Sequence, residues 1–382
     1  MSEAQPAKVP EKKVPGKVVW EYPQQIPGQA YSTAPVRCCP MPFGKARFVV
    51  CLGKRVMALE WKNQGLEKLW EYDTGAHIPA TAVLGSDGLF RVHAGDGVLH
   101  CLDQNGQKVW DPIEVGEPLG WAAPVVDEQG NTYISGYGGG LYKVTAAGEF
   151  KKAAYFRTRQ KFDSAGLIHQ NVLYIGSEDA FVYAIDLSGS FGRNLWDQLE
   201  ERGKTDWFIN SAPALSLGAT VVVAGRDEHL YGFRMDGKSA WKVHIAGQML
   251  ASPVISGDGD IFVGVSLVRA KQSDKGKLVC VDGNTHGIRW EYEAKGAVES
   301  TPVIGDDDLI YFGDNAGFVH AVRADGQAAW KQSVRVAVRS AAMIVGQNRL
   351  VLGRDNGTLV GMLCSSGGVA SRGWPKYMAK YG

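Results

Sequence analysis

Short apolar runs recur along the whole chain, each bounded by glycine, aspartate or asparagine. Runs such as Tyr174-Ile175-Gly176 and Phe262-Val263-Gly264 end in glycine, and Ser86-Asp87-Gly88 and Asp355-Asn356-Gly357 are turn sequences typical of β-hairpins. Larger side chains alternate with small ones along many of these runs, as a strand with a period of two requires. The pattern therefore predicts many short antiparallel strands joined by tight turns.

The strand pattern itself repeats. Each unit has a three-residue motif before its first strand: a small residue, then any residue, then proline or a replacement for it. The third residue of this motif, called the repeat position here, falls at residues 35, 82, 124, 166, 213, 253, 302 and 342. The mean spacing is about 44 residues, which is typical of propeller blades of four strands each. The last unit stops before its fourth strand, whereas residues 16–22 form a fourth strand with no unit before it. We therefore predict an all-β chain, a single eight-bladed β-propeller of four-stranded antiparallel blades, with the ring closed by the N-terminal strand.

Composition and charge narrow the classes of function. The chain has 382 residues, of which 48 are glycine and 11 are tryptophan, and its 41 Lys and Arg balance 40 Asp and Glu. No basic excess indicates a nucleic-acid partner, and no apolar run is long enough for a membrane span. Residues 1–16 lack the apolar stretch of a secretory signal, so we expect a cytoplasmic protein. The expected division is a disordered arm at 1–15, the propeller at 16–368 and a C-terminal tail at 369–382.

A Gly-x-x-x-Trp unit accompanies most repeats, as at Gly106–Trp110, Gly237–Trp241 and Gly326–Trp330. With Val182-Tyr183-Ala184-Ile185-Asp186 and Ser211-Ala212-Pro213, it resembles the pyrroloquinoline-quinone (PQQ) repeat over nearly the whole chain. That family contains quinoprotein alcohol dehydrogenases and non-enzymatic scaffolds such as an outer-membrane assembly lipoprotein, and this chain resembles the scaffold members. The resemblance implies that one series of tryptophans docks each blade on the next: Trp20, Trp70, Trp110, Trp196, Trp241, Trp290 and Trp330.

Adjacent Cys38 and Cys39 favour the enzyme members, because the resemblance implies a vicinal disulfide over the quinone and a nearby calcium ion. We place both cysteines within or beyond the first strand of their unit, away from the loop face of the family's active site. In a chain without an export signal they would stay reduced. The acidic clusters Asp258–Asp260 and Asp306–Asp308 fall at hairpins, where aspartate is common because its side chain hydrogen-bonds the backbone of the turn. We predict no catalytic residues, no metal site and no cofactor.

Function is expected on the face that carries the second-to-third-strand turns and the blade-to-blade loops. Blades 3 to 5 depart most from the repeat, with Lys152 where a docking tryptophan is expected, and blade 6 carries an insertion from Ser266 to Lys275. Aromatic residues bordered by arginine in these loops match the composition of interface anchors, although Trp121 and Phe208 could instead cap neighbouring blades. We predict one or more protein partners within a larger assembly, bound at Trp121, Arg157, Arg159, Trp207, Phe208 and Arg226. A PQQ-dependent dehydrogenase and a carbohydrate-binding propeller are the alternatives.

Overall fold

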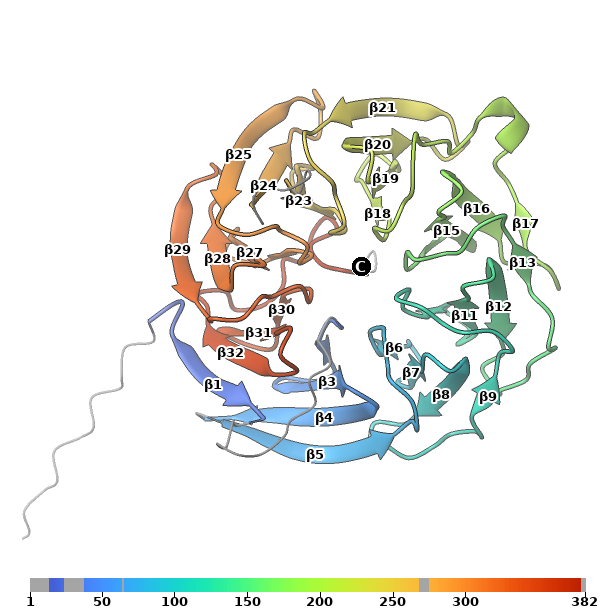
Figure 1. Cartoon of the computed structure of the whole chain (residues 1–382), viewed down its shortest axis with the longest axis horizontal. Coiled ribbons are helices and arrows are strands. Elements are labelled where there is room, and N and C mark those ends of the chain that lie inside the picture. Colours follow the sequence, from blue (N-terminus) through green and yellow to red (C-terminus); the bar gives the residue numbers. More distant parts are fainter. Residues whose placement is uncertain (1–13, 24–37, 64, 268–274, 379–382) are drawn as a thin grey trace, which may run out of the picture.

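The computed structural model describes residues 14–23, 38–63, 65–267 and 275–378. Most of the predicted arm, Pro35 and most of the blade 6 insertion lie outside these ranges. The strands of the described residues form eight four-stranded sheets, which stand as blades around a central axis (Figure 1). The predicted eight-bladed propeller is therefore confirmed. The described part of the chain contains one short 3-10 helix, η1 (Gln198–Glu200), and none of its helices has the length and hydropathy needed to span a membrane.

Each blade is an antiparallel sheet, and in seven of them the strands follow the chain order outward from the axis, whereas β1 is the outermost strand of the eighth (Figure 1). Blades 1 and 2 comprise β2 (Met41–Pro42), β3 (Arg47–Leu52), β4 (Arg55–Lys62), β5 (Gly65–Asp73), then β6 (Val83–Leu84), β7 (Phe90–His93), β8 (Val98–Leu102) and β9 (Ile113–Glu114). Blades 3 and 4 comprise β10 (Val125–Val126), β11 (Thr132–Ser135), β12 (Gly140–Val144), β13 (Phe156–Arg157), then β14 (Leu167–His169), β15 (Val172–Gly176), β16 (Val182–Asp186) and β17 (Arg193–Asn194). Blades 5 and 6 comprise β18 (Ala214–Leu215), β19 (Val221–Ala224), β20 (His229–Phe233), β21 (Ser239–His244), then β22 (Val254–Ile255), β23 (Ile261–Ser266), β24 (Gly276–Val281) and β25 (Ile288–Ala294). Blades 7 and 8 comprise β26 (Val303–Ile304), β27 (Ile310–Gly313), β28 (Phe318–Val322), β29 (Ala328–Ser333), then β30 (Met343–Ile344), β31 (Arg349–Gly353), β32 (Leu359–Leu363) and β1 (Val18–Tyr22).

The N-terminal strand closes the ring, as predicted. Strand β1 pairs antiparallel with β32, so that Trp20 lies opposite Gly361. The guanidinium of Arg354 donates to both carboxylate oxygens of Glu21, at 3.0 and 2.9 Å. The Arg354 side chain is 3 % exposed and that of Glu21 is 47 % exposed, so a buried guanidinium fastens the last blade through a carboxylate at the protein surface.

Tryptophans of the repeat lie between their own blade and the next one. The indole N–H groups of Trp70 and Trp196 donate to Gln104 O at 2.8 Å and Met235 O at 3.0 Å in the following blade. A Cβ atom on Gly106 would lie 2.7 Å from the Trp70 ring, and one on Gly237 would lie 2.6 Å from the Trp196 ring. Both glycines also have positive φ, +78° and +83°. The turn beneath each indole therefore needs glycine for space and for backbone conformation.

The inner side of these indoles covers the small residue of the third strand. Trp241 is the strand partner of Gly232, and a Cβ atom there would lie 2.2 Å from the indole. Trp290 likewise pairs with Cys280, and Trp330 with Ala321. The small third-strand position is therefore required by the tryptophan of the same blade.

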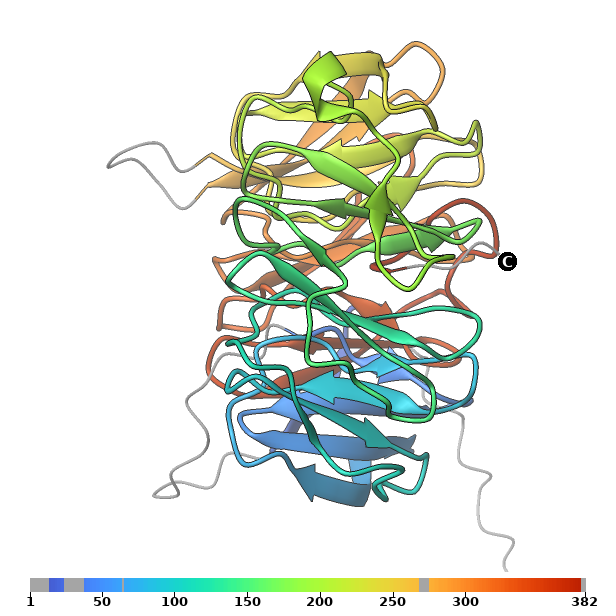
Figure 2. The same ribbon diagram turned by 90° about the vertical axis from the view of Figure 1, so that its right-hand side faces the viewer.

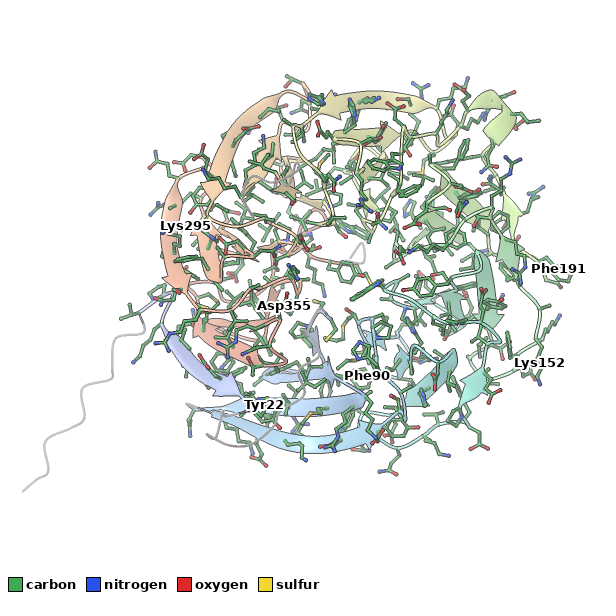
Figure 3. The ribbon with its side chains drawn as sticks, in the orientation of Figure 1. Tyr22, Phe90, Lys152, Phe191, Lys295 and Asp355 are labelled. Carbon is green, nitrogen blue, oxygen red and sulfur yellow. The ribbon has the colours of Figure 1, made fainter. Side chains whose placement is uncertain are left out.

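Blade 3 uses a different residue for the same contact. Lys152 is exposed at the outer circumference of the ring (Figure 3), and Tyr155, three residues later, is 5 % exposed. The Tyr155 hydroxyl donates to Gly189 O at 3.1 Å in blade 4, and a Cβ atom on Gly192 would lie 2.9 Å from its ring. Tyr155 therefore takes the position that tryptophan holds elsewhere, displaced along the chain.

The first blade begins five residues later than the sequence pattern placed it. First strands start directly after the repeat position, as Val125 follows Pro124 and Ala214 follows Pro213. Because β2 starts at Met41, the position belongs to Pro40, and its assignment to Pro35 was wrong. The placement of Cys38 and Cys39 within or beyond the first strand was wrong for the same reason: they precede it.

The C-terminal tail runs into the centre of the ring (Figure 1). Trp374 exchanges backbone hydrogen bonds with Ile255 at 2.7 and 2.8 Å, and Ile304 N donates to Pro375 O at 2.8 Å. Trp374 is 3 % exposed, and Tyr377 packs against core residues near the axis. The tail thus joins the inner strands of blades 6 and 7 and fills part of the central channel.

We expect Trp196→Ala to destabilise the propeller by about 3–5 kcal/mol, because it removes a fully buried aromatic side chain and its inter-blade hydrogen bond. Trp196 is 2 % exposed, whereas Trp121 is 44 % exposed. Trp121→Ala is therefore the matched control, expected to change stability by about 0.5 kcal/mol or less. Urea unfolding followed by circular dichroism measures both, and equal losses would contradict the docking role.

The ring closure should depend on pH through Glu21. The hydrogen bonds from Arg354 hold the pKa of the Glu21 carboxyl below its ordinary value of 4.5. A lowered folded-state pKa means that the pair stabilises the fold above pH 4.5 and loses this contribution as the pH falls further. Wild type should therefore exceed Glu21→Gln in melting temperature at pH 7, and the difference should shrink below pH 4.5. A difference that stays constant from pH 7 to pH 3 would refute this role.

Candidate interaction face

The second-to-third-strand turns and the blade-to-blade loops lie side by side on one face, joined by a repeated backbone hydrogen bond. The turn N–H donates to a carbonyl of the preceding loop in these pairs: Gly95 to His77, Tyr137 to Pro118, Glu178 to Lys161, Arg226 to Phe208, Asn315 to Ala297 and Asp355 to Ala337. Seen edge-on, the ring is a disc with loops along both faces (Figure 2). Because each turn is tied to its loop, side chains on this face are held in fixed relative positions.

Three of the predicted interface residues form one cluster on blade 5. The Arg226 guanidinium lies 5.7 Å from the centre of the Trp207 ring, and the Phe208 ring lies 5.4 Å from that of Trp207. Thr205 Oγ1 donates to Trp207 O at 2.8 Å, and Arg226 N donates to Phe208 O at 3.2 Å. Trp207 nevertheless remains 44 % exposed. The loop therefore presents a fixed aromatic surface with a cation over it.

Trp121 belongs to a second group nearer the axis. Its side chain hydrogen-bonds that of Tyr137, and the Lys161 ammonium lies 5.0 Å from the Tyr137 ring centre. Burial and the nearby Asp163 carboxylate raise the pKa of Tyr137 above its ordinary value. Both rings are partly exposed, 44 % for Trp121 and 40 % for Tyr137.

The two other predicted arginines lie apart from these groups. Arg157 is on β13, where it donates to the Tyr142 hydroxyl at 3.3 Å and to Gly138 O at 3.5 Å. Arg159 lines a groove on blade 4 together with Phe181, Tyr183 and Leu199. The described contacts therefore gather Trp207, Phe208 and Arg226, and leave Arg157 and Arg159 on other parts of blades 3 and 4.

Apart from Trp121, sequence reasoning missed the polar residues at the mouth of the central channel. A cavity of about 150 Å³ opens there. Its outer lining residues stand three positions before the repeat position of their blades: Trp121, Asp163, Asn210, Leu250 and Arg339. This constant offset in the repeat was the signal that could have found them. Thr81, Ser252 and Thr301 also line the cavity, and the hydroxyl oxygen of each accepts a hydrogen bond from a backbone N–H group of the preceding blade.

Cys38 and Cys39 line this same cavity, together with Tyr377. The Cys38 thiol donates to Cys51 O at 3.2 Å, and burial raises the pKa of Cys39 to about 12. A quinone enzyme of this family would also need acidic and amide groups open to calcium. Around the mouth, each of four carboxylates already has a cationic side chain as partner, because Lys161 binds Asp163 and Glu178, and Arg339 binds Glu299 and Asp355.

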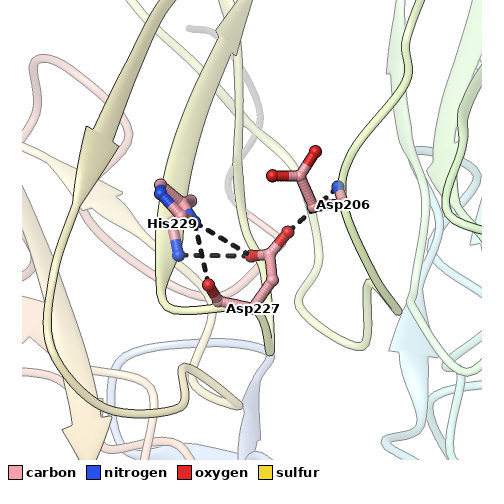
Figure 4. Close-up of side chains that lie close together, drawn as sticks. All are labelled: Asp206, Asp227 and His229. Carbon is pink, nitrogen blue, oxygen red and sulfur yellow. Dashed lines mark hydrogen bonds and ion pairs between the residues drawn. The ribbon is translucent and has the colours of Figure 1, made fainter.

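Among the described residues, Asp206, Asp227 and His229 are the one group of three potential metal ligands that lie together (Figure 4). Asp227 accepts hydrogen bonds from Asp206 N at 3.0 Å and from the Tyr231 hydroxyl, and Asp206 pairs with Lys242. Blade 4 repeats the aspartate–tyrosine contact without a histidine, since the Tyr183 hydroxyl donates to Asp179 at 2.6 Å. The contacts of Asp227 therefore belong to a turn that recurs in the repeat and is stabilised by an aspartate side chain, and we assign no ion to them.

Comparisons with known proteins agree with this architecture. The family described as outer membrane protein assembly factor BamB matches residues 11–198 and 226–373. BamB from Moraxella catarrhalis is 17 % identical with a TM-score of 0.66, over 85 % of this chain and 96 % of that chain. The computationally designed Ika8 protein (13 % identity, TM-score 0.69) and Saccharomyces cerevisiae Sqt1 (12 % identity, TM-score 0.71) each match 87 % of this chain and 96 % of their own. At such identities these structures show the fold alone, and no curated protein sequence matches the chain.

The six cysteines should resist alkylation in the folded protein, because all are buried and the reagent must reach the sulfur atom. Burial raises the pKa of Cys101 to about 11 and that of Cys280 to about 12. After treatment with a reductant, native protein at pH 8 should incorporate little iodoacetamide by mass spectrometry, whereas urea-unfolded protein should react at all six. Rapid native labelling at Cys38 or Cys39 would show that the channel thiols are accessible.

Proposed function

This chain belongs to the family described as outer membrane protein assembly factor BamB, and on that premise we propose that it is a non-catalytic propeller that binds a protein partner through its loop face. The observation that carries the proposal is the Trp207 cluster. A tryptophan that docks no blade stays 44 % exposed while its loop, Phe208 and Arg226 hold it in place. Tryptophan and arginine are the residues most enriched among interface hot spots.

The contact centres on Trp207, Phe208 and Arg226 and extends toward Trp121 on the same face. A pre-positioned aromatic surface favours binding because little side-chain entropy is lost when the complex forms. Arg157 and Arg159 would mark the margin of the interface, where exposed charges affect association rate more than affinity. The cytoplasmic location and the lack of a nucleic-acid partner stay predictions from the sequence.

We expect Trp207→Ala to abolish or greatly reduce capture of the partner from an extract of the native host, because truncation of a central aromatic anchor typically costs at least about 2 kcal/mol. The measurement is affinity purification followed by mass spectrometry, with partner amounts compared between wild type and variant. Phe191→Ala is the matched control, since Phe191 is 66 % exposed at the outer circumference of blade 4 (Figure 3). If wild type, Trp207→Ala and Arg226→Ala retain the same proteins in equal amounts, the proposed interface is wrong.

A further inference from the structure

Two clusters of alternating charge lie on opposite sides of the ring, in blades 4–5 and 7–8 (Figure 1), and reach the cavity through Asp163 and Asn210 in one and Arg339 in the other. In the first, the Lys161 ammonium lies 2.9 Å from Asp163 and 3.4 Å from Glu178, and Asn210 donates to Glu178 at 3.3 Å. In the second, Arg339 binds Glu299 at 3.1 Å and also Asp355. Four carboxylates thus face two cations, and with Lys376, whose charge acts on the cavity residue Cys39, the formal charge around the mouth is −1.

Oxygen acceptors in these clusters are left without hydrogen-bond partners. They are Asp163 Oδ1, Asn210 Oδ1 and Asp355 Oδ1, each with almost no exposed surface. The Asp163 side chain is only 11 % exposed, and both Asp163 and Asn210 line the cavity. A buried acceptor without a donor is costly, so the mouth is suited to a ligand that brings N–H donors and positive charge.

We propose that the channel mouth receives a lysine or arginine side chain from the protein partner, an inference that rests on the proposed function. Charge favours a cation, and the unpaired oxygens need donors, which both side chains supply. A cavity of about 150 Å³ is larger than a single ion needs, and its lining combines the oxygens of Asp163 and Asn210 with Leu250 and small apolar residues, against which an aliphatic stem would pack. Trp121, at the rim, offers a flat ring against which a guanidinium stacks.

This site also fits the geometry of the proposed interface. Trp121 links the mouth to Tyr137 and Lys161, and Asn210 is three residues from Trp207 on the same loop. Tyr377 and the two cysteines line the cavity at the axis. A partner that covers the Trp207 cluster can therefore extend one basic side chain into the mouth.

The test uses the full chain and the capped peptide acetyl-Gly-Arg-Gly-amide, with its neutral citrulline analogue as the matched ligand. Binding is followed at low salt by NMR through the Trp121 indole N–H resonance, which Trp121→Phe identifies. The arginine peptide should shift this resonance, and the citrulline peptide should bind about tenfold or more weakly because it lacks the charge. The affinity should also fall as salt rises.

Protein variants test the same point. Glu178→Gln and Glu299→Gln should each weaken peptide binding several-fold, whereas Asp111→Asn should not, since the Asp111 side chain is 95 % exposed in an ion pair with Lys108. Thermal unfolding checks that the variants are folded. The salt dependence of peptide binding to the wild-type protein tests the same inference without any variant. Equal binding of both peptides, or binding unaffected by salt and by the mouth variants, overturns the inference.

The two proposals can fail separately. Partner capture that needs Trp207 but is unchanged in Glu178→Gln and Glu299→Gln refutes the basic side chain and leaves the interface standing. Specific arginine-peptide binding without Trp207-dependent capture supports the cation site and refutes the interface. If free spermidine binds as tightly as the peptide and capture ignores the mouth variants, the mouth takes a small cation, and docking of a protein side chain is overturned.

Discussion

The propeller depends on one repeated contact, an indole held between the small third-strand residue of its own blade and the glycine turn of the next. Trp70 and Trp196 show the half toward the next blade, with a hydrogen bond across the gap and no room for a side chain on Gly106 or Gly237, and Trp241 shows the half within its own blade, opposite Gly232. Dispersion and burial act together with a directional bond at Trp70, Trp196 and Trp290. The buried indole N–H groups of Trp20, Trp110 and Trp330, by contrast, have no hydrogen-bond partner within the described part of the chain, so packing of the ring is the part of the contact that recurs. Blade 3 makes the contact with Tyr155, which shows that an aromatic ring with a hydrogen-bond donor suffices.

Because these contacts and the closure by β1 fix the outer part of the ring, the loop face and the channel mouth are free to vary. The same positions around the axis carry Trp121, Asp163, Asn210, Leu250 and Arg339, residues with no chemistry in common. At the outer positions of the repeat, by contrast, aromatic residues and glycine recur. Variation at a fixed structural position on a rigid scaffold is the usual basis of specific recognition.

The fold was largely predictable, and the sites were predictable only in part. Repeat spacing, turn sequences and the unpaired N-terminal strand gave eight blades and their closure, since each is a local pattern. Two errors came from treating local patterns as sufficient. Pro35 resembled the repeat position, but only the start of β2 at Met41 shows that Pro40 holds it. Tyr155 was overlooked because its displacement along the chain hides the equivalence until the blades are placed side by side.

The sequence by itself determined the number of blades, the strand order and the series of tryptophans, because strands and turns are local features whose spacing along the chain can be counted. It also indicated Trp207, Phe208 and Arg226, although not that their side chains stack. Only the tertiary structure decided which residues share the axis. Asp163 and Arg339 are 176 positions apart in the chain, yet they line one cavity because the ring closes. Closure converts residues distant in sequence into neighbours, and no local pattern carries that information.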